Sequence, residues 1–218
     1  AFDELLDLLA RHENQSAIVY CFSRKETESL AADLSHHGIT AMPYHAGLES
    51  TVRRATQDRF IKDETSVIVA TIAFGMGIDK PDVRLVVHYN LPKTLEGYYQ
   101  ETGRAGRDGL PSDCVLFYSY GDKIKQDFFV AKIEDDTDRK NDEGRLASMV
   151  QYAETGRCRR RFLLAYFGEQ RTEDNCGGCD VCLRAGEEFD ATEIAQKILS
   201  AVIRTGERFG VNYVVEVL

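Results

Sequence analysis

The amino-acid sequence predicts an α/β protein that begins with a parallel sheet and its flanking helices and continues as a helical region. Short apolar runs rich in β-forming residues alternate with helical patterns as far as residue 120, which is typical of βαβ units. Beyond residue 120 the pattern is helical and richly charged, and four of the six cysteines lie within 158–182. We therefore expect three parts, with bounds 1–120, 121–188 and 189–218.

Each element of the first part follows from a local pattern. Ser23 opens a helix with Glu26 three residues later, the arrangement of a capping box, and Gly38 ends that helix. Thr94 is expected to cap a further helix, which carries the arginines discussed below. Helices are expected at 3–12, 23–37 and 50–62, and strands at 16–22, 40–44, 66–70, 84–89 and 113–119.

The remaining parts have helical patterns. Residues 121–167 are expected to be helical, and the acidic run 134–142 within them is expected to be an exposed turn between helices. A further helix is expected at 191–205.

Composition restricts the class of protein. The chain has 218 residues, of which 43% are apolar, so it can build a sizeable core. No run of about eighteen apolar residues occurs, so no membrane span is predicted, and acids stand where a signal peptide carries lysines. The net charge of −9 argues against general adhesion to nucleic acid, so such contacts are expected only at local basic clusters.

Four cysteines have the spacing of a metal site. They are Cys158, Cys176, Cys179 and Cys182, with seventeen, two and two residues between them. Four thiolates can close a tetrahedral zinc site, and a Cys-x2-Cys-x2-Cys run also fits an iron–sulfur cluster. The spacing by itself leaves both metals open.

A glycine-rich stretch places two arginines close together. If it is helical, Gln100, Arg104 and Arg107 recur at i, i+4 and i+7 and share one face. The glycines and the alanine around them leave room for a bulky anion. Guanidinium groups in such surroundings suit a transferring phosphoryl group.

The motifs occur in an order that resembles a known family. Residues 100–109, Gln-Glu-Thr-Gly-Arg-Ala-Gly-Arg-Asp-Gly, resemble motif VI of superfamily 2 helicases in the form used by the RecQ DNA helicases. Residues 17–28 resemble motif IV, 44–48 resemble the segment that follows it, and 67–81 resemble motif V. With the cysteine cluster, the resemblance covers nearly the whole chain.

The resemblance implies an identity for each part. It implies a second RecA-like helicase domain at 1–120, a helical zinc-binding subdomain at 121–188 and the truncated beginning of a winged-helix domain at 189–218. The chain has no P-loop and no metal-binding acid motif, and in RecQ helicases both lie in a first RecA-like domain upstream. We therefore expect a piece of an ATP-dependent DNA helicase that translocates 3′ to 5′, and no activity from the piece alone.

The resemblance also implies roles for individual residues. Arg107 is expected to be the arginine finger on the γ-phosphate, and Arg104 is the second catalytic candidate. Structural Zn²⁺ is favoured over iron–sulfur for the four cysteines, and ATP with Mg²⁺ is expected on the upstream domain. Nucleotide contacts are expected at Gln100 and Asp79, and DNA contacts at Ser23, Thr71, Arg159 and Arg160.

The implied partners are single-stranded and duplex DNA, the upstream domain with the P-loop, and single-strand DNA-binding protein. The resemblance also implies a role in DNA repair and recombination. The expected location is inside the cell, in the cytoplasm or nucleoid of a bacterium or in the nucleus of a eukaryote. The alternative is a stand-alone, non-catalytic zinc-bearing module that binds DNA or protein. An RNA helicase of the same superfamily is disfavoured, because those proteins usually carry a His-Arg-x-Gly-Arg motif VI and lack the cysteines.

Overall fold

The computed structural model describes residues 1–71, 79–184 and 190–217. The chain divides into two compact units, Ala1–Asp174 and Asn175–Leu218. Each unit is described by itself.

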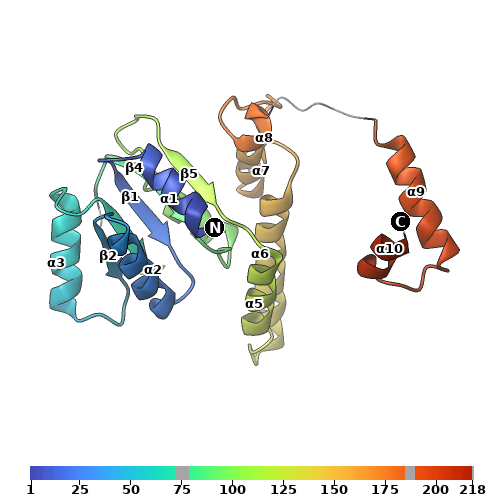
Figure 1. The fold of residues 1–218 in the computed structure, drawn as a ribbon, viewed down its shortest axis with the longest axis horizontal. Helices are drawn as coiled ribbons and strands as arrows, with labels where there is room; N and C mark the ends of the chain where they lie inside the picture. Colours follow the sequence, from blue (N-terminus) through green and yellow to red (C-terminus); the bar gives the residue numbers. More distant parts are fainter. Residues whose placement is uncertain (72–78, 185–189, 218) are drawn as a thin grey trace. The chain divides into compact units, whose positions relative to one another are not determined.

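The larger unit contains a five-stranded parallel sheet (Figure 1), as the alternating pattern predicts. The strand order is β2-β3-β1-β4-β5, so β1 lies at the centre between β3 and β4. The strands are β1 (Ser16–Tyr20), β2 (Ala41–Tyr44), β3 (Val67–Ala70), β4 (Val83–His88) and β5 (Asp113–Leu116).

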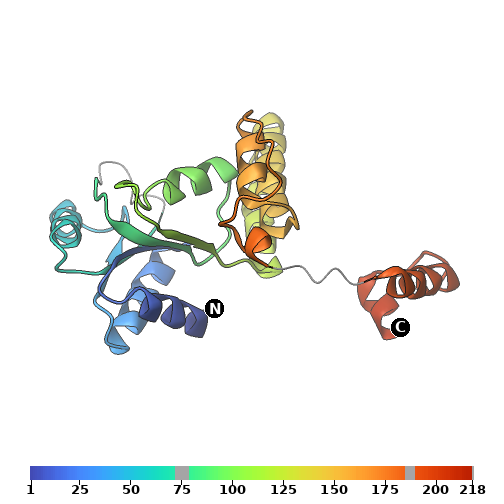
Figure 2. The ribbon, with the colours of Figure 1, turned by 90° about the horizontal axis from the view of Figure 1, so that it is seen from above.

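Helices cover both faces of this sheet. The helices are α1 (Phe2–Arg11), α2 (Arg24–His36), α3 (Ser50–Ile61) and α4 (Leu95–Thr102). Leu5 of α1 and Leu34 of α2 pack with Val19 on one face, whereas Phe60 of α3 packs with Ile18 on the other. Figure 2 shows α1 and α4 on opposite sides of the sheet.

The predicted helix caps are present. Ser23 Oγ accepts a hydrogen bond from the Glu26 N–H at 3.2 Å, and Thr94 Oγ1 accepts one from the Gly97 N–H at 3.1 Å. The Glu26 carboxylate bonds back to the Phe22 N–H at 3.3 Å. The capping residues therefore fix where α2 and α4 begin.

Two strands end at least two residues before the predicted position. The strand predicted at 16–22 ends at Tyr20, since the Phe22 N–H donates to the Asn90 side chain at 2.9 Å. The strand predicted at 113–119 ends at Leu116, and Ser119 instead caps the next helix.

Three helices follow the sheet in the larger unit, namely α5 (Tyr120–Val130), α6 (Asp136–Glu154) and α7 (Arg159–Tyr166). Leu146, Met149 and Tyr152 of α6 pack with Val130 and with Tyr98 of α4. This second core joins the three helices to the sheet domain.

The exposed turn predicted at 134–142 is wrong for most of its length, because α6 begins at Asp136. The Asp135 carboxylate accepts the N–H groups of Thr137 and Asp138 at 2.8 and 2.9 Å. Acidic side chains also suit the positive end of the helix dipole. The acidic run therefore starts a helix, and the connection is confined to the residues before it.

The smaller unit contains α8 (Asp180–Leu183), α9 (Thr192–Arg204) and α10 (Val211–Val217). The helix predicted at 191–205 matches α9 to within one residue at each end. The rings of Phe209 and Tyr213 stack with centroids 4.2 Å apart. Among the helices of the described residues, none is both long enough and apolar enough to cross a bilayer.

The motif after α4 is a turn anchored to β4. We call residues 103–109 the arginine turn. Gly106 has φ +60°, which a right-handed helix does not allow. The Gly106 N–H donates to the Val83 carbonyl at 3.0 Å, and the Asp108 N–H donates to the Pro81 carbonyl at 3.2 Å. These bonds replace the i to i−4 bonds that would continue α4.

The predicted shared helical face is therefore wrong. Gln100 lies on α4, whereas Arg104 and Arg107 lie beyond its end in the arginine turn. A turn allows the two arginine side chains to face different surroundings, which a common helical face would not.

Replacing Gly106 with Ala should destabilise the chain more than replacing Gly109. Both glycines have positive φ, so each alanine carries a backbone cost of about 1–2 kcal/mol. A Cβ on Gly106 would also lie 2.7 Å from the Leu110 carbonyl oxygen and from Ser112 Oγ, whereas a Cβ on Gly109 would meet no atom of the described residues within 4 Å. The further loss for Gly106→Ala should be about 1–3 kcal/mol. Urea unfolding followed by circular dichroism measures both, and equal losses would contradict the packing argument.

Candidate functional site

The carboxyl edge of the sheet gathers two of the four predicted DNA contacts, Ser23 and Thr71. Tyr20, the last residue of β1, is in register with Ala70 of β3 and His88 of β4. Ser23 follows β1 and Thr71 follows β3. These strands are neighbours in the sheet, so both residues lie at the same edge. Ligands of parallel α/β sheets bind outside this edge.

Donors at this edge can approach a phosphate. Ser23 Oγ accepts the helix-capping bond, which leaves its O–H able to donate. The positive end of the α2 dipole lies at the same place. Residues 72–78, which belong to the segment resembling motif V, lie outside the described residues.

Asn90 is a residue of this edge that the sequence reasoning missed. Its Oδ1 accepts from the Phe22 N–H at 2.9 Å, and its Nδ2 donates to Glu26 Oε1 at 3.1 Å. Asn90 therefore ties the loop after β4 to the start of α2. An amide directly after a buried strand was the available signal.

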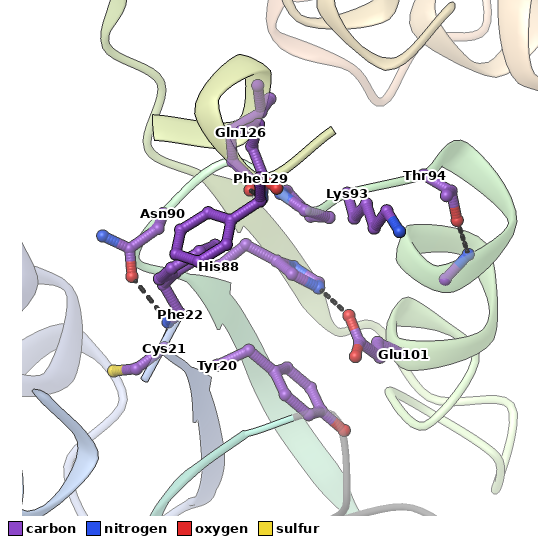
Figure 3. Close-up of a pocket in the computed structure, with 13 residues that line it drawn as sticks. Tyr20, Cys21, Phe22, His88, Asn90, Lys93, Thr94, Glu101, Gln126 and Phe129 are labelled. Atoms are coloured by element: carbon purple, nitrogen blue, oxygen red, sulfur yellow. Dashed lines mark hydrogen bonds and ion pairs between the residues drawn. The ribbon is translucent and has the colours of Figure 1, made fainter. Parts of the chain in front are cut away.

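A pocket of about 240 Å³ opens beside Asn90, between the sheet edge, the α4 start and α5 (Figure 3). Its lining is largely apolar, with Phe22 and Phe129 on one side, their ring centroids 5.3 Å apart. His88 and Glu101 supply polar groups on the other side, where His88 Nε2 lies 2.7 Å from Glu101 Oε2.

The two arginines of the turn have opposite surroundings. The Arg107 side chain is 35% exposed, and its Nη1 lies 3.2 Å from Asp79 Oδ1. Arg104 is only 7% exposed, and its guanidinium hydrogen-bonds the Tyr20 hydroxyl. Arg107 is therefore the arginine that a ligand can reach, and Arg104 lies behind it.

Tyr20, like Arg104, is buried. Burial raises the pKa of the Tyr20 hydroxyl well above its ordinary value, and the negative charge of Glu101 adds to the effect. The hydrogen bond and positive charge of Arg104 act in the opposite direction. The hydroxyl therefore stays protonated at neutral pH.

The side chain of Arg84, on β4, holds the arginine turn in place. Its guanidinium pairs with the Asp108 carboxylate and donates to the carbonyls of Leu110 and Pro111 at 3.2 Å. It also donates to Ser112 Oγ at 3.1 Å. Among the predicted nucleotide contacts, Asp79 lies beside this turn, whereas Gln100 is exposed on α4.

The four cysteines have the donor set of a structural metal site. The Sγ atoms of Cys158, Cys176, Cys179 and Cys182 all lie within 4.8 Å of one another. A Zn–S bond of about 2.3 Å sets neighbouring sulfurs at about 3.8 Å, so a modest contraction would close a tetrahedron. The Cys182 N–H points to Cys179 Sγ at 3.4 Å, and the Cys176 N–H to Cys182 Sγ at 3.3 Å. Backbone N–H groups thus point at two of the four sulfurs.

The arginines after Cys158 differ in what they contact. Arg159 donates to the carbonyls of Tyr152 and Ala153 at 2.7 and 3.4 Å, at the end of α6. Arg160 is exposed, and Arg161 pairs with Asp174. Of the two predicted DNA contacts here, Arg160 has the accessible position, whereas Arg159 is engaged at the helix terminus.

Three families match successive parts of the chain. The helicase conserved C-terminal domain matches residues 1–109, the RecQ zinc-binding family matches 120–183, and the RQC domain matches 185–218.

Individual relatives agree with these matches. The ATP-dependent DNA helicase RecQ of Pasteurella multocida is 43% identical over 216 residues, covering 99% of this chain and 34% of the relative. That of Bacillus subtilis is 46% identical over 208 residues, covering 95% and 35%. The chain thus spans about a third of the length of these relatives. A solved DEAD box protein from Methanococcus jannaschii is 27% identical with a TM-score of 0.51, covering 59% of this chain and 35% of that one.

Metal analysis should find one zinc ion per chain. Replacing Cys179 with Ala should abolish zinc binding and lower the helical content, because the binding free energy of such a site is folding free energy. Replacing Cys114, which lies on β5 outside the cluster, with Ser should leave the zinc content unchanged. Iron with sulfide, or a folded preparation without metal, would refute the zinc assignment.

Proposed function

The chain belongs to the RecQ family of superfamily 2 helicases, as its motifs predict, and on that premise we propose that it completes the catalytic core of an ATP-dependent DNA helicase. In this proposal, residues 1–120 serve as the second RecA-like domain, 121–188 as the zinc-binding subdomain and 189–218 as the start of a winged helix. The whole protein would hydrolyse ATP and translocate 3′ to 5′ on single-stranded DNA.

The observation that carries the proposal is the geometry of the arginine turn. Arg107 is accessible on a turn that Arg84 and β4 hold in place, while Arg104 is buried behind it. A guanidinium positioned in advance can stabilise charge that develops on a transferring phosphoryl group. Arg107 therefore acts as the arginine finger in this proposal, and Arg104 supports the turn.

ATP and Mg²⁺ would be bound by the P-loop domain upstream and supply the phosphoryl chemistry. The ion pair between Arg107 and Asp79 would then separate, which lets Arg107 face the γ-phosphate. Asp79 would be left to accept a hydrogen bond from a ribose hydroxyl, and Gln100 would assist nucleotide binding from α4. Closure of the two domains would couple these contacts to movement along DNA.

DNA contacts are proposed at two places. Ser23 and Thr71, with the α2 N-terminus, would hold the phosphates of a single strand at the sheet edge. Arg160 would contact the phosphates of duplex DNA near the cysteines, with Arg159 orienting that segment. Single-strand DNA-binding protein and an intracellular location remain proposals that rest on the family.

The second candidate is a stand-alone zinc-bearing module that binds DNA or protein. It is favoured by one observation, namely that the 218 residues contain no P-loop. The chain alone and the chain joined to an upstream P-loop domain should therefore be compared in an ATPase assay with DNA. Turnover only in the joined protein supports the helicase proposal, and no turnover in either supports the module.

In the joined protein, replacing Arg107 with Ala should lower ATP turnover by roughly 10³-fold or more, with ATP binding largely kept. The reason is that a finger acts on charge that develops in the transition state. Arg107→Lys should rescue little, because an ammonium lacks the planar fork. Arg104→Ala should also lower turnover. Arg59→Ala, at an exposed arginine of α3, is the control and should turn over normally. Near-normal turnover of Arg107→Ala would refute the assignment.

The isolated chain should bind DNA weakly, with a dissociation constant of roughly 10⁻⁶ M or weaker at physiological salt. Its net charge of −9 leaves only local arginines to attract phosphates. Replacing Arg160 with Ala should weaken binding and lower the slope of log K against log salt by about 1, whereas Arg59→Ala should leave the slope unchanged. Fluorescence anisotropy at several salt concentrations measures this. Tight binding that persists at high salt would show that the DNA site lies elsewhere.

A further inference from the structure

A buried hydrogen bond between a histidine and a glutamate lies directly before the arginine turn. His88 closes β4, and Glu101 lies in the last turn of α4, two residues ahead of the arginine turn. His88 is 1% exposed and Glu101 is 6% exposed, and His88 Nε2 lies 2.7 Å from Glu101 Oε2 (Figure 3). A carboxylate only accepts hydrogen bonds, so Nε2 carries the proton and donates it.

Aromatic rings hold His88 in place. Tyr20 stacks on the imidazole with centroids 5.1 Å apart and an interplanar angle of 21°, and the Tyr98 ring lies 4.8 Å from it at an angle of 52°. Tyr98 in turn shares a hydroxyl–hydroxyl hydrogen bond of 3.3 Å with Tyr152 of α6. The imidazole can therefore hardly rotate, and the direction of its N–H toward α4 is fixed.

Stability alone does not account for this pair. Among the described residues, His88 Nδ1 is buried without a hydrogen-bond partner, which costs free energy. A carboxylate and an imidazole removed from water also lose hydration, and well-packed apolar residues are often at least as stable in such places. A directional bond between a strand end and a helix end instead fixes the axial position and the rotation of α4.

We propose that His88 and Glu101 are positioning residues that set the arginine turn, and through it Arg107, for phosphoryl transfer. The two residues do not reach the ligand themselves. Glu101 fixes the end of α4, Arg104 packs inward against Tyr20 from the next turn, and Arg107 is left facing outward. This inference rests on the helicase function proposed above.

The test compares variants of the protein joined to its upstream P-loop domain. His88→Leu with Glu101→Leu removes both partners together, so neither side chain of the pair is left without the other, and the denaturation midpoint should be close to that of the parent. ATP turnover at saturating DNA should nevertheless fall by roughly 10- to 100-fold with little change in the KM for ATP, because a small misplacement of a catalytic group is costly. His88→Gln with Glu101 kept can still donate to the carboxylate, and it should recover much of the turnover.

Two controls separate the outcomes. Tyr98→Phe removes a buried hydroxyl of the same cluster but keeps the ring against His88, and it should leave turnover within about twofold of the parent if only the pair sets the turn. Arg107→Ala is measured in parallel. Loss of turnover in Arg107→Ala together with normal turnover in the double leucine variant would overturn the positioning role while leaving the proposed function intact. Normal turnover in Arg107→Ala would instead overturn the proposed function.

Discussion

The main-chain hydrogen bonds between the arginine turn and the start of β4 are the constraint on which the candidate site depends. The Gly106 N–H reaches the Val83 carbonyl, so the chain leaves helical geometry as soon as α4 ends. Only glycine fits there, because φ is positive and a Cβ would meet the Leu110 carbonyl oxygen at 2.7 Å. The turn then sends Arg104 inward and Arg107 outward. A continued helix would have placed both guanidinium groups on one face, with no buried support behind the exposed one.

The sheet supplies the second half of the site through its topology. Parallel pairing of β1 with β3 and β4 brings Ser23 and Thr71 to one edge, although 47 residues separate them in sequence. The same register places Tyr20 next to His88, which creates the buried aromatic layer behind the arginine turn. One arrangement of strands therefore gathers the proposed single-strand contacts Ser23 and Thr71 at the edge and the support of the proposed finger beneath it. These positions come from backbone pairing, so side-chain substitutions elsewhere should leave them in place.

The helical region extends this support toward the cysteines. Tyr152 of α6 packs on Tyr98 of α4, and its carbonyl accepts from Arg159, the residue after Cys158. A cysteine of the candidate metal site and the helix that leads to the arginine turn are thus linked through one packed core. Four thiolates on one metal ion would bring excess negative charge, and arginines follow Cys158 directly in a chain that is acidic overall. The linkage would give a metal at the cysteines a physical route to affect the proposed arginine finger without contacting a nucleotide.

The sequence by itself determined what depends on local patterns. Alternating apolar runs predict the parallel sheet, Ser23 and Thr94 predict the caps of α2 and α4, and the cysteine spacing predicts the metal cluster. Motif order also indicates the family. Only the tertiary structure decided that α4 stops before the arginines, that the acidic run starts α6, and that His88 pairs with Glu101. The end of α4 and the His88–Glu101 contact depend on groups that come together only when the chain is folded. The start of α6 depends on which acidic residue caps the helix. The spacing of apolar residues along a helix does not reveal any of these partners.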